Sequence, residues 1–281
     1  MIVQINNLFL SLKRPLLALF LLVVVQFLCA AGVLAISAIS NNINVNEAIM
    51  NFATDTQTLC ISSLLSNVLI TCICLYLFNR NNYNNWKSPF RKTSIIRNSI
   101  ALLTCFIGTF ALDLMSELLA LPNIMELQII KMCQHPLGIA AISIGAPIGE
   151  EIVFRWGIMG HLLQKGNSPF IAILISALLF GLIHANPIQI FFASAMGMML
   201  GLLYWRSGSI MLPILLHCVN NSLACLQVSL LGNKVRDFSL VETFGGYSIA
   251  WYLALTCSLL CLGILWWYST NGKHNTPIPN Y

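Results

Sequence analysis

Charged residues are scarce in this chain of 281 residues: they make up 8% of it, whereas hydrophobic residues make up 58%. Together with a mean hydropathy of +0.81, this composition excludes a water-soluble domain of the same length. The sequence therefore predicts an all-α polytopic membrane protein whose helices span a lipid bilayer.

Several recognisable features are also missing from the sequence. No nucleic-acid motif, soluble domain, low-complexity segment or clear internal repeat is visible. The ten cysteines are scattered singly, and Cys72 and Cys74 lack the two-residue gap of a redox or zinc pair. All of them except Cys133 fall within or at the edge of apolar stretches, where cysteine acts as a small apolar side chain. A cysteine metal site and a nucleic-acid partner are therefore not expected.

Eight stretches approach the roughly 20 apolar residues that a spanning helix needs. They lie near residues 15–39, 60–78, 98–121, 137–163, 169–186, 187–205, 209–231 and 247–268. The first is too long for the apolar region of a secretory signal and is interpreted as a signal anchor. Residues 1–130 are expected to supply about three helices, and residues 131–281 a catalytic core of about five, within one membrane domain.

Basic residues predict the orientation, because cytoplasmic loops collect Lys and Arg. With the N-terminus inside, ten basic residues lie on the cytoplasmic side: Lys13, Arg14, Arg80, Lys87, Arg91, Lys92, Arg97, Lys165, Arg206 and Lys273. Only three lie outside: Lys131, Lys234 and Arg236. Both termini are therefore expected in the cytoplasm, and the protein is expected in a bacterial inner membrane. The cluster over residues 80–97 is interpreted as a loop that faces lipid head groups rather than nucleic acid.

Polar residues interrupt the apolar C-terminal half at three places. In the first, Glu151 and Arg155 are four residues apart and share a helix face, in the order that favours an ion pair. Glu150 is rotated by about 100° from Glu151, which leaves it freer to act as a general base. The alternative is a buried ion network that only holds helices together.

The second and third interruptions are Phe180-Gly-Leu-Ile-His184 and His217-Cys-Val-Asn-Asn221. His217 and Asn221 are four residues apart, so both are expected to face one cavity, with Asn220 pointing elsewhere. Gly197 and Gly201 form a small face on which a neighbouring helix can approach closely.

Glu-Glu-x-x-x-Arg, Phe-x-x-x-His and His-x-x-x-Asn, in this order on successive apolar helices, resemble the CPBP family of intramembrane proteases (CAAX prenyl protease and bacteriocin-processing, or abortive-infection, family). The resemblance covers roughly residues 140–225. It implies an eight-helix membrane fold and endopeptidase activity. It also implies that Glu150 and His184 activate the attacking water and that His217 and Asn221 stabilise the oxyanion. The supporting positions of the motifs are Glu151, Arg155 and Phe180.

The need for a cofactor stays open at this point. Glu150, His184 and His217 are an acceptable ligand set for zinc, as the label metalloendopeptidase often given to the family implies. The sequence has no His-Glu-x-x-His helix, however, and a metal-free glutamate–histidine pair explains the same residues. The implied substrates are peptides or proteins with a hydrophobic, CAAX-like lipidated or bacteriocin-like segment.

Two other functional classes compete with a peptidase. Asp113 and Glu117 form a second acidic face, so a transporter or channel with an ion path is one alternative. The chain shows no pair of matching interrupted helices of the kind found in inverted-repeat transporters. The second alternative is a non-catalytic scaffold or immunity protein with the same fold. For Asp113 and Glu117 themselves, pairing or solvation is the expected role.

Overall fold

The described part of the chain is helical throughout. The computed structural model describes residues 2–44, 46–47, 49–50, 55–79 and 93–271, and no strand occurs among them. The elements are α1 (Ile2–Asn41), α3 (Thr56–Asn79), α4 (Ile95–Leu118), α5 (Glu126–Cys133), α6 (Pro136–Ala140), η1 (Ala141–Gly145), α7 (Ala146–Glu151), η2 (Ile152–Met159), α8 (Gly160–Gln164), α9 (Pro169–Leu182), α10 (Pro187–Ser207), α11 (Met211–Leu231), η3 (Gly232–Asp237), α12 (Leu240–Thr243) and α13 (Tyr247–Thr270). The predicted all-α membrane class is confirmed.

Seven of the eight predicted spans are helices long and apolar enough to cross a membrane. The stretch predicted at 169–186 is not, because α9 has only 14 residues, or about 21 Å of helix. Ser168 caps its start with a hydrogen bond from the amide of Ile171 (3.3 Å). Its end is followed by Ala185, whose φ is +50°, and by Pro187, and neither residue continues a helix.

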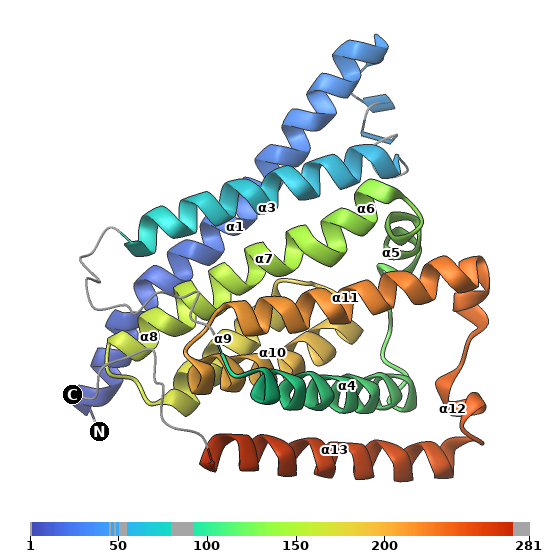
Figure 1. The fold of residues 1–281 in the computed structure, drawn as a ribbon. Coiled ribbons are helices and arrows are strands. Elements are labelled where there is room, and N and C mark those ends of the chain that lie inside the picture. The colour runs from blue at the N-terminus through green and yellow to red at the C-terminus, as the bar shows by residue number, and fades with distance from the viewer. Residues whose placement is uncertain (1, 45, 48, 51–54, 80–92, 272–281) are drawn as a thin grey trace.

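The start of α1 and the end of α13 lie on the same side of the bundle (Figure 1). This agrees with the expectation that both ends of the bundle share one side. The predicted cytoplasmic residues Arg80, Lys87, Arg91, Lys92 and Lys273 lie outside the described residues, and the division at residue 130 stays a prediction.

The central pass switches between α- and π-helix along its length. It consists of α6, η1, α7, η2 and α8, and η1 and η2 are π-helical. Pro147, in the first turn of α7, has no N–H to bond the preceding turn. The N–H of Ala146 instead bonds the carbonyl of Ala141, five residues back. The wider turns leave the pass continuous through Pro147, and such segments often occur at functional sites.

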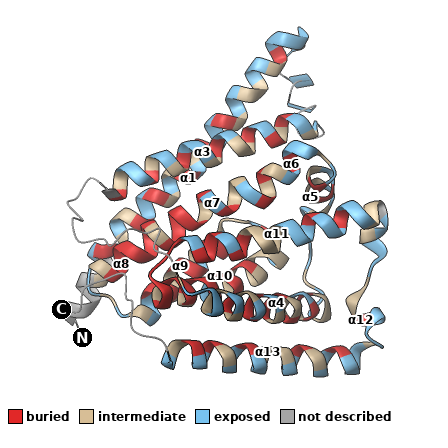
Figure 2. Ribbon diagram, viewed as in Figure 1, coloured by how far each residue is buried: buried red, intermediate tan, exposed pale blue. Residues whose placement is uncertain are grey.

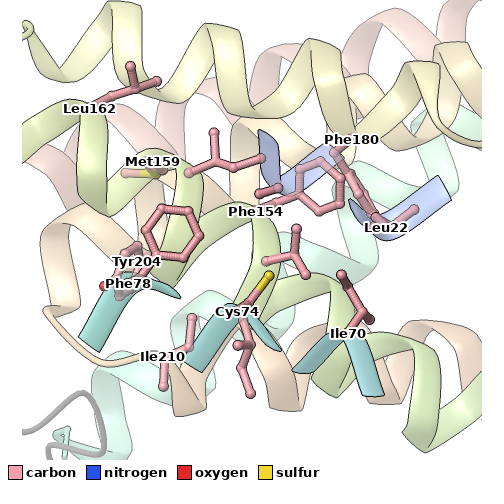
Figure 3. Close-up of a cluster of buried hydrophobic side chains, with 14 of the residues drawn as sticks. Leu22, Ile70, Cys74, Phe78, Phe154, Met159, Leu162, Phe180, Tyr204 and Ile210 are labelled. Carbon is pink, nitrogen blue, oxygen red and sulfur yellow. The ribbon is translucent and has the colours of Figure 1, made fainter. Parts of the chain in front are cut away.

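The buried core surrounds this central pass, while the outer helices expose apolar side chains. The largest buried cluster joins side chains from α1, α3, η2, α8, α9, α10 and α11, and Figure 3 shows Phe154 and Phe180 side by side within it. Figure 2 shows buried residues concentrated towards the middle of the bundle and many exposed ones along α1 and α13. Exposed leucines, isoleucines and tryptophans on α1 and α13 suit contact with lipid.

Helices α9 and α10 approach each other closely because small residues lie between them. A Cβ on Gly181 would lie 2.7 Å from the carbonyl oxygen of Ile190, and one on Gly197 would lie 3.1 Å from the Cα of Ala177. The close approach predicted for the Gly197 and Gly201 face is thus confirmed. The contact places the end of α9, with Phe180 and His184, against the central pass.

Candidate functional site

A buried ion cluster joins the central pass to α11. One oxygen of Glu151, Oε1, lies 2.9 Å from Arg155 Nη1 and also 2.9 Å from His217 Nδ1. The side chains of Glu151 and Arg155 are fully buried, and that of His217 is 5% exposed. The predicted Glu151–Arg155 pair is confirmed, and it lies at the junction of α7 with the π-helical segment. The contact with His217, which is 66 residues away, was not predicted.

Glu150 is the more accessible of the two adjacent carboxylates. Its Oε2 lies 3.7 Å from His217 Nε2, and its side chain is 17% exposed whereas Glu151 is 0% exposed. His217 is its only polar partner among the described residues. A distance of 3.7 Å is too long for a direct hydrogen bond. The geometry therefore agrees with the prediction that Glu150 is the freer carboxylate, because Glu151 already has two partners.

The ring of Phe180 lies at the centre of the cluster. It contacts both imidazoles edge-on, with centroids 5.1 Å from His184 and 5.7 Å from His217. The guanidinium carbon of Arg155 lies 4.3 Å from its centroid, a distance at which the ring face attracts the cation. Phe180 therefore gives Arg155 a second favourable contact and holds the two histidines on one scaffold.

His184 lies in the turn between α9 and α10. Its Nδ1 is 2.9 Å from the carbonyl oxygen of Phe180. A carbonyl only accepts hydrogen bonds, so Nδ1 carries the proton, and in the neutral ring Nε2 is left with a lone pair. No ion pair between His184 and Glu150 occurs in the described structure. The structure thus brings Glu150 to His217, whereas the resemblance paired Glu150 with His184.

Asn186 attaches this turn to the segment that follows α4. Its side chain is fully buried, donates to Asn123 Oδ1 (2.8 Å) and accepts from the amide of Ile124 (3.2 Å). The amide of Ile188 also bonds the carbonyl of Pro122 (3.3 Å). These bonds attach the segment after α4 to the turn that carries His184.

Asn221 lies one helical turn after His217 and is also fixed by hydrogen bonds. Its Nδ2 donates to the carbonyl of Ile142 in η1 (2.9 Å), and its Oδ1 accepts from Nδ2 of Asn220 (3.2 Å). That Asn220 lies outside the cavity faced by His217 and Asn221 stays a prediction, although its amide reaches Asn221 Oδ1. Asn221 keeps one amide hydrogen for another acceptor.

The second acidic face predicted on α4 lies outside this cluster. Both oxygens of Glu117 accept bonds at the start of α12: the amides of Leu240 (2.9 Å) and Val241 (3.3 Å) and the hydroxyl of Ser239. Glu117 therefore satisfies the first amides of α12, whereas the sequence predicted pairing with a basic residue or solvation. Asp113 has no polar partner among the described residues.

A divalent metal would have to be held by Glu150, His184 and His217. No group of three His, Cys, Asp or Glu side chains among the described residues is arranged to hold a metal ion. Glu150 approaches His217 only to 3.7 Å, and His184 is bonded to a backbone carbonyl. Two ligands of a tetrahedral zinc ion at about 2.0–2.2 Å lie about 3.3–3.6 Å from each other, so Glu150 and His217 have nearly the spacing of a ligand pair, but no third ligand joins them among the described residues.

Comparison with known proteins finds similarity over the segment that contains these residues. Residues 133–223 match the family model described as "Type II CAAX prenyl endopeptidase Rce1-like". The matched segment contains every candidate residue from Glu150 to Asn221. Residues 133–223 are therefore similar to the CPBP family.

Two relatives show how far the similarity extends. The protein named "Putative membrane peptidase YdiL" from Bacillus subtilis (strain 168) is 41% identical over 92 residues, which are 33% of this chain and 37% of that protein. The "Uncharacterized 24.3 kDa protein" from Escherichia coli is 28% identical over 171 residues, 57% of this chain and 76% of that protein. No solved structure matches the chain. The alignment thus spans well under half the length of YdiL.

Proposed function

We propose that this protein is an intramembrane endopeptidase of the CPBP family that hydrolyses a peptide bond with an activated water. Its proposed substrates are peptides or proteins with a hydrophobic, CAAX-like lipidated or bacteriocin-like segment. The observation that carries the proposal is the convergence of Glu150, Glu151, Arg155 and His217 from two helices. Four ionisable groups inside a membrane bundle are costly, and such groups are usually functional.

In the proposed reaction, Glu150 is the general base and His184 assists it. The water oxygen attacks the carbonyl carbon of the substrate while its proton passes to Glu150. The peptide C–N bond then breaks, and the proton is delivered to the leaving amine nitrogen. His184 suits the delivery of this proton because its Nδ1–H is held by the carbonyl of Phe180. The lone pair of Nε2 then takes the proton from Glu150 and passes it to the leaving nitrogen.

The negative charge on the carbonyl oxygen is proposed to be stabilised by His217 and Asn221. When His217 carries both ring protons, Nδ1–H donates to Glu151 and Nε2–H is left as a donor. Two carboxylates, one guanidinium and one imidazolium then have no net charge, which suits a poorly hydrated site. Asn221 is held by Asn220 and Ile142 and presents its remaining amide hydrogen.

The proposed role of Glu151 and Arg155 is to position His217. Glu151 fixes the imidazole through Nδ1, as a carboxylate does in other hydrolytic sites. Arg155 balances the charge of Glu151 and is itself held by the ring of Phe180. This division assigns chemistry to the partly exposed carboxylate and support to the fully buried one.

The test compares wild type with Glu150→Gln in detergent, on internally quenched peptides that include prenylated C-terminal peptides. General-base catalysis contributes about 10²–10⁴-fold, so we expect Glu150→Gln to lose cleavage by that factor while remaining folded. Glu117→Gln is the matched control, since Glu117 caps α12, and should leave kcat within a few-fold of wild type. Equal cleavage by Glu150→Gln and wild type would contradict the assignment.

Two further arms separate the alternatives. Chelation before the assay tests the divalent-metal alternative: loss of cleavage, restored by zinc, would favour a metalloendopeptidase. A scaffold or immunity protein should bind its partner equally well with Glu150→Gln. A transporter should show ion flux across vesicles that the variant changes without any peptide being cut.

A further inference from the structure

Two buried cysteines from different elements lie in contact at the end of the bundle opposite the start of α1. Cys133, the last residue of α5, and Cys225 in α11 have their Sγ atoms 3.0 Å apart. Each residue is 1% exposed. A disulfide has an S–S length of about 2.05 Å, so forming the bond needs a movement of roughly 1 Å. They are the only two cysteines in sulfur–sulfur contact within the described residues.

Several contacts hold α5 against α11 and η3. The hydroxyl of Ser229 donates to the carbonyl of Cys133 (3.2 Å), and Arg236 Nε lies 3.4 Å from Glu126 Oε2. Ile130 and Val228 complete a small apolar cluster with the two cysteines. A helix of 8 residues is too short to be stable alone, so these contacts decide whether α5 stays docked.

We propose that Cys133 and Cys225 are a disulfide site that locks α5 onto α11. The oxidant is a disulfide compound or a protein thiol oxidase. A thiolate of the pair attacks the disulfide of the oxidant and releases one thiol. The second cysteine then attacks the mixed disulfide and releases the other thiol. Two cysteine thiols are oxidised to one disulfide, the disulfide of the oxidant is reduced to two thiols, and both protons leave with those thiols.

The position in the bundle favours oxidation. In Figure 1, α5 and α12 lie at the end opposite the start of α1, which the distribution of basic residues predicts to be outside the cytoplasm. Disulfides form and persist in such compartments. Access is provided by opening of α5, since short peripheral segments open locally far more often than the core.

The lock also borders the candidate active site. Cys225 lies one helical turn after Asn221 on α11, and α5 leads directly into the segment whose Ile142 carbonyl accepts from Asn221. A closed disulfide would therefore fix α11 to α5 at Cys225 and help to hold the hydrogen bond of Asn221 to Ile142 one turn earlier. This consequence is separate from the proposed peptidase function, and the test below needs no activity.

The experiment treats the full chain in native membranes with dipyridyl disulfide, blocks the remaining thiols by alkylation after denaturation, and maps the peptides by mass spectrometry. We expect loss of both alkylatable thiols and a cross-linked Cys133–Cys225 peptide that dithiothreitol separates. Cys72 is exposed and isolated, so it reports that the reagent has reached the protein, as a mixed disulfide.

Two single-cysteine variants test whether the cross-link is specific to this pair. Cys133→Ser and Cys225→Ser should each abolish the cross-link and leave the partner without an internal disulfide. Oxidation should raise the melting temperature of wild type but not of either variant. The proposal is overturned if Cys72 is modified while Cys133 and Cys225 remain alkylatable, or if they form only mixed disulfides or bonds to other cysteines.

Discussion

Arg155 offers the sharpest test of the buried ion cluster. Its guanidinium is fully buried, lies 2.9 Å from Glu151 and 4.3 Å from the Phe180 centroid. Arg155→Met removes the charge, keeps most of the apolar stem and leaves the carboxylate of Glu151 buried without its cation. Breaking a buried pair in this way costs about 3–5 kcal/mol, to which the lost ring contact adds about 1–2 kcal/mol.

The double variant shows whether this cost comes from the unpaired charge. Glu151→Gln removes the negative charge but keeps an oxygen that accepts from His217 Nδ1. Combined with Arg155→Met, it leaves no uncompensated charge at this pair, so we expect the double variant to recover about 2 kcal/mol or more relative to the sum of the single changes. The free energy of unfolding is measured for wild type, the two single variants and the double variant by titration with a denaturing detergent followed by circular dichroism. Additive losses, or a loss below about 1 kcal/mol for Arg155→Met, would refute the reasoning.

Two further predictions concern packing and hydrogen bonding at the site. In Gly197→Ala the new Cβ would lie 3.1 Å from Arg155 Nη2, so we expect overpacking to lower the free energy of unfolding by about 1–3 kcal/mol, seen as a lower melting temperature. Gly201→Ala, whose Cβ would meet only movable side chains, should be neutral or stabilising; the reverse order would contradict the packing. For the oxyanion, Asn221→Ala should lower kcat about 10²–10³-fold. Asn220→Ala, which removes one bond that orients Asn221, should lower it only about 5- to 10-fold, and equal losses would exclude a supporting role.

Local features of the sequence predict much of this structure. Apolar length predicts the long helices, and the four-residue spacing of Glu151 and Arg155 predicts their ion pair. Both depend on neighbours along one helix, so they can be derived without knowing the fold. The short α9 was mispredicted for a related reason: its residues are apolar up to Ile183, and only Ala185 and Pro187 end the pass early.

The remaining features depend on contacts between distant segments. The bond from His217 to Glu151 spans 66 residues, and the bond from Asn221 to Ile142 spans 79. Neither distance follows from helical periodicity. The π-helical turns around Pro147 could not be predicted from the sequence either, because the same residues are compatible with a kinked α-helix. The contact of Cys133 with Cys225 could not be expected from ten cysteines without paired spacing.

The two adjacent glutamates show why this site depends on contacts between helices and not on one sequence motif. Side chains at consecutive helical positions diverge by about 100°, so one imidazole can lie between them only if another helix supplies it. His217 does so, with Nδ1 towards the fully buried Glu151 and Nε2 towards the partly exposed Glu150. Arg155 then balances Glu151 alone, which leaves Glu150 with the weaker partner and the greater exposure. Chemistry assigned to Glu151 instead would require its two short contacts to break during every turnover.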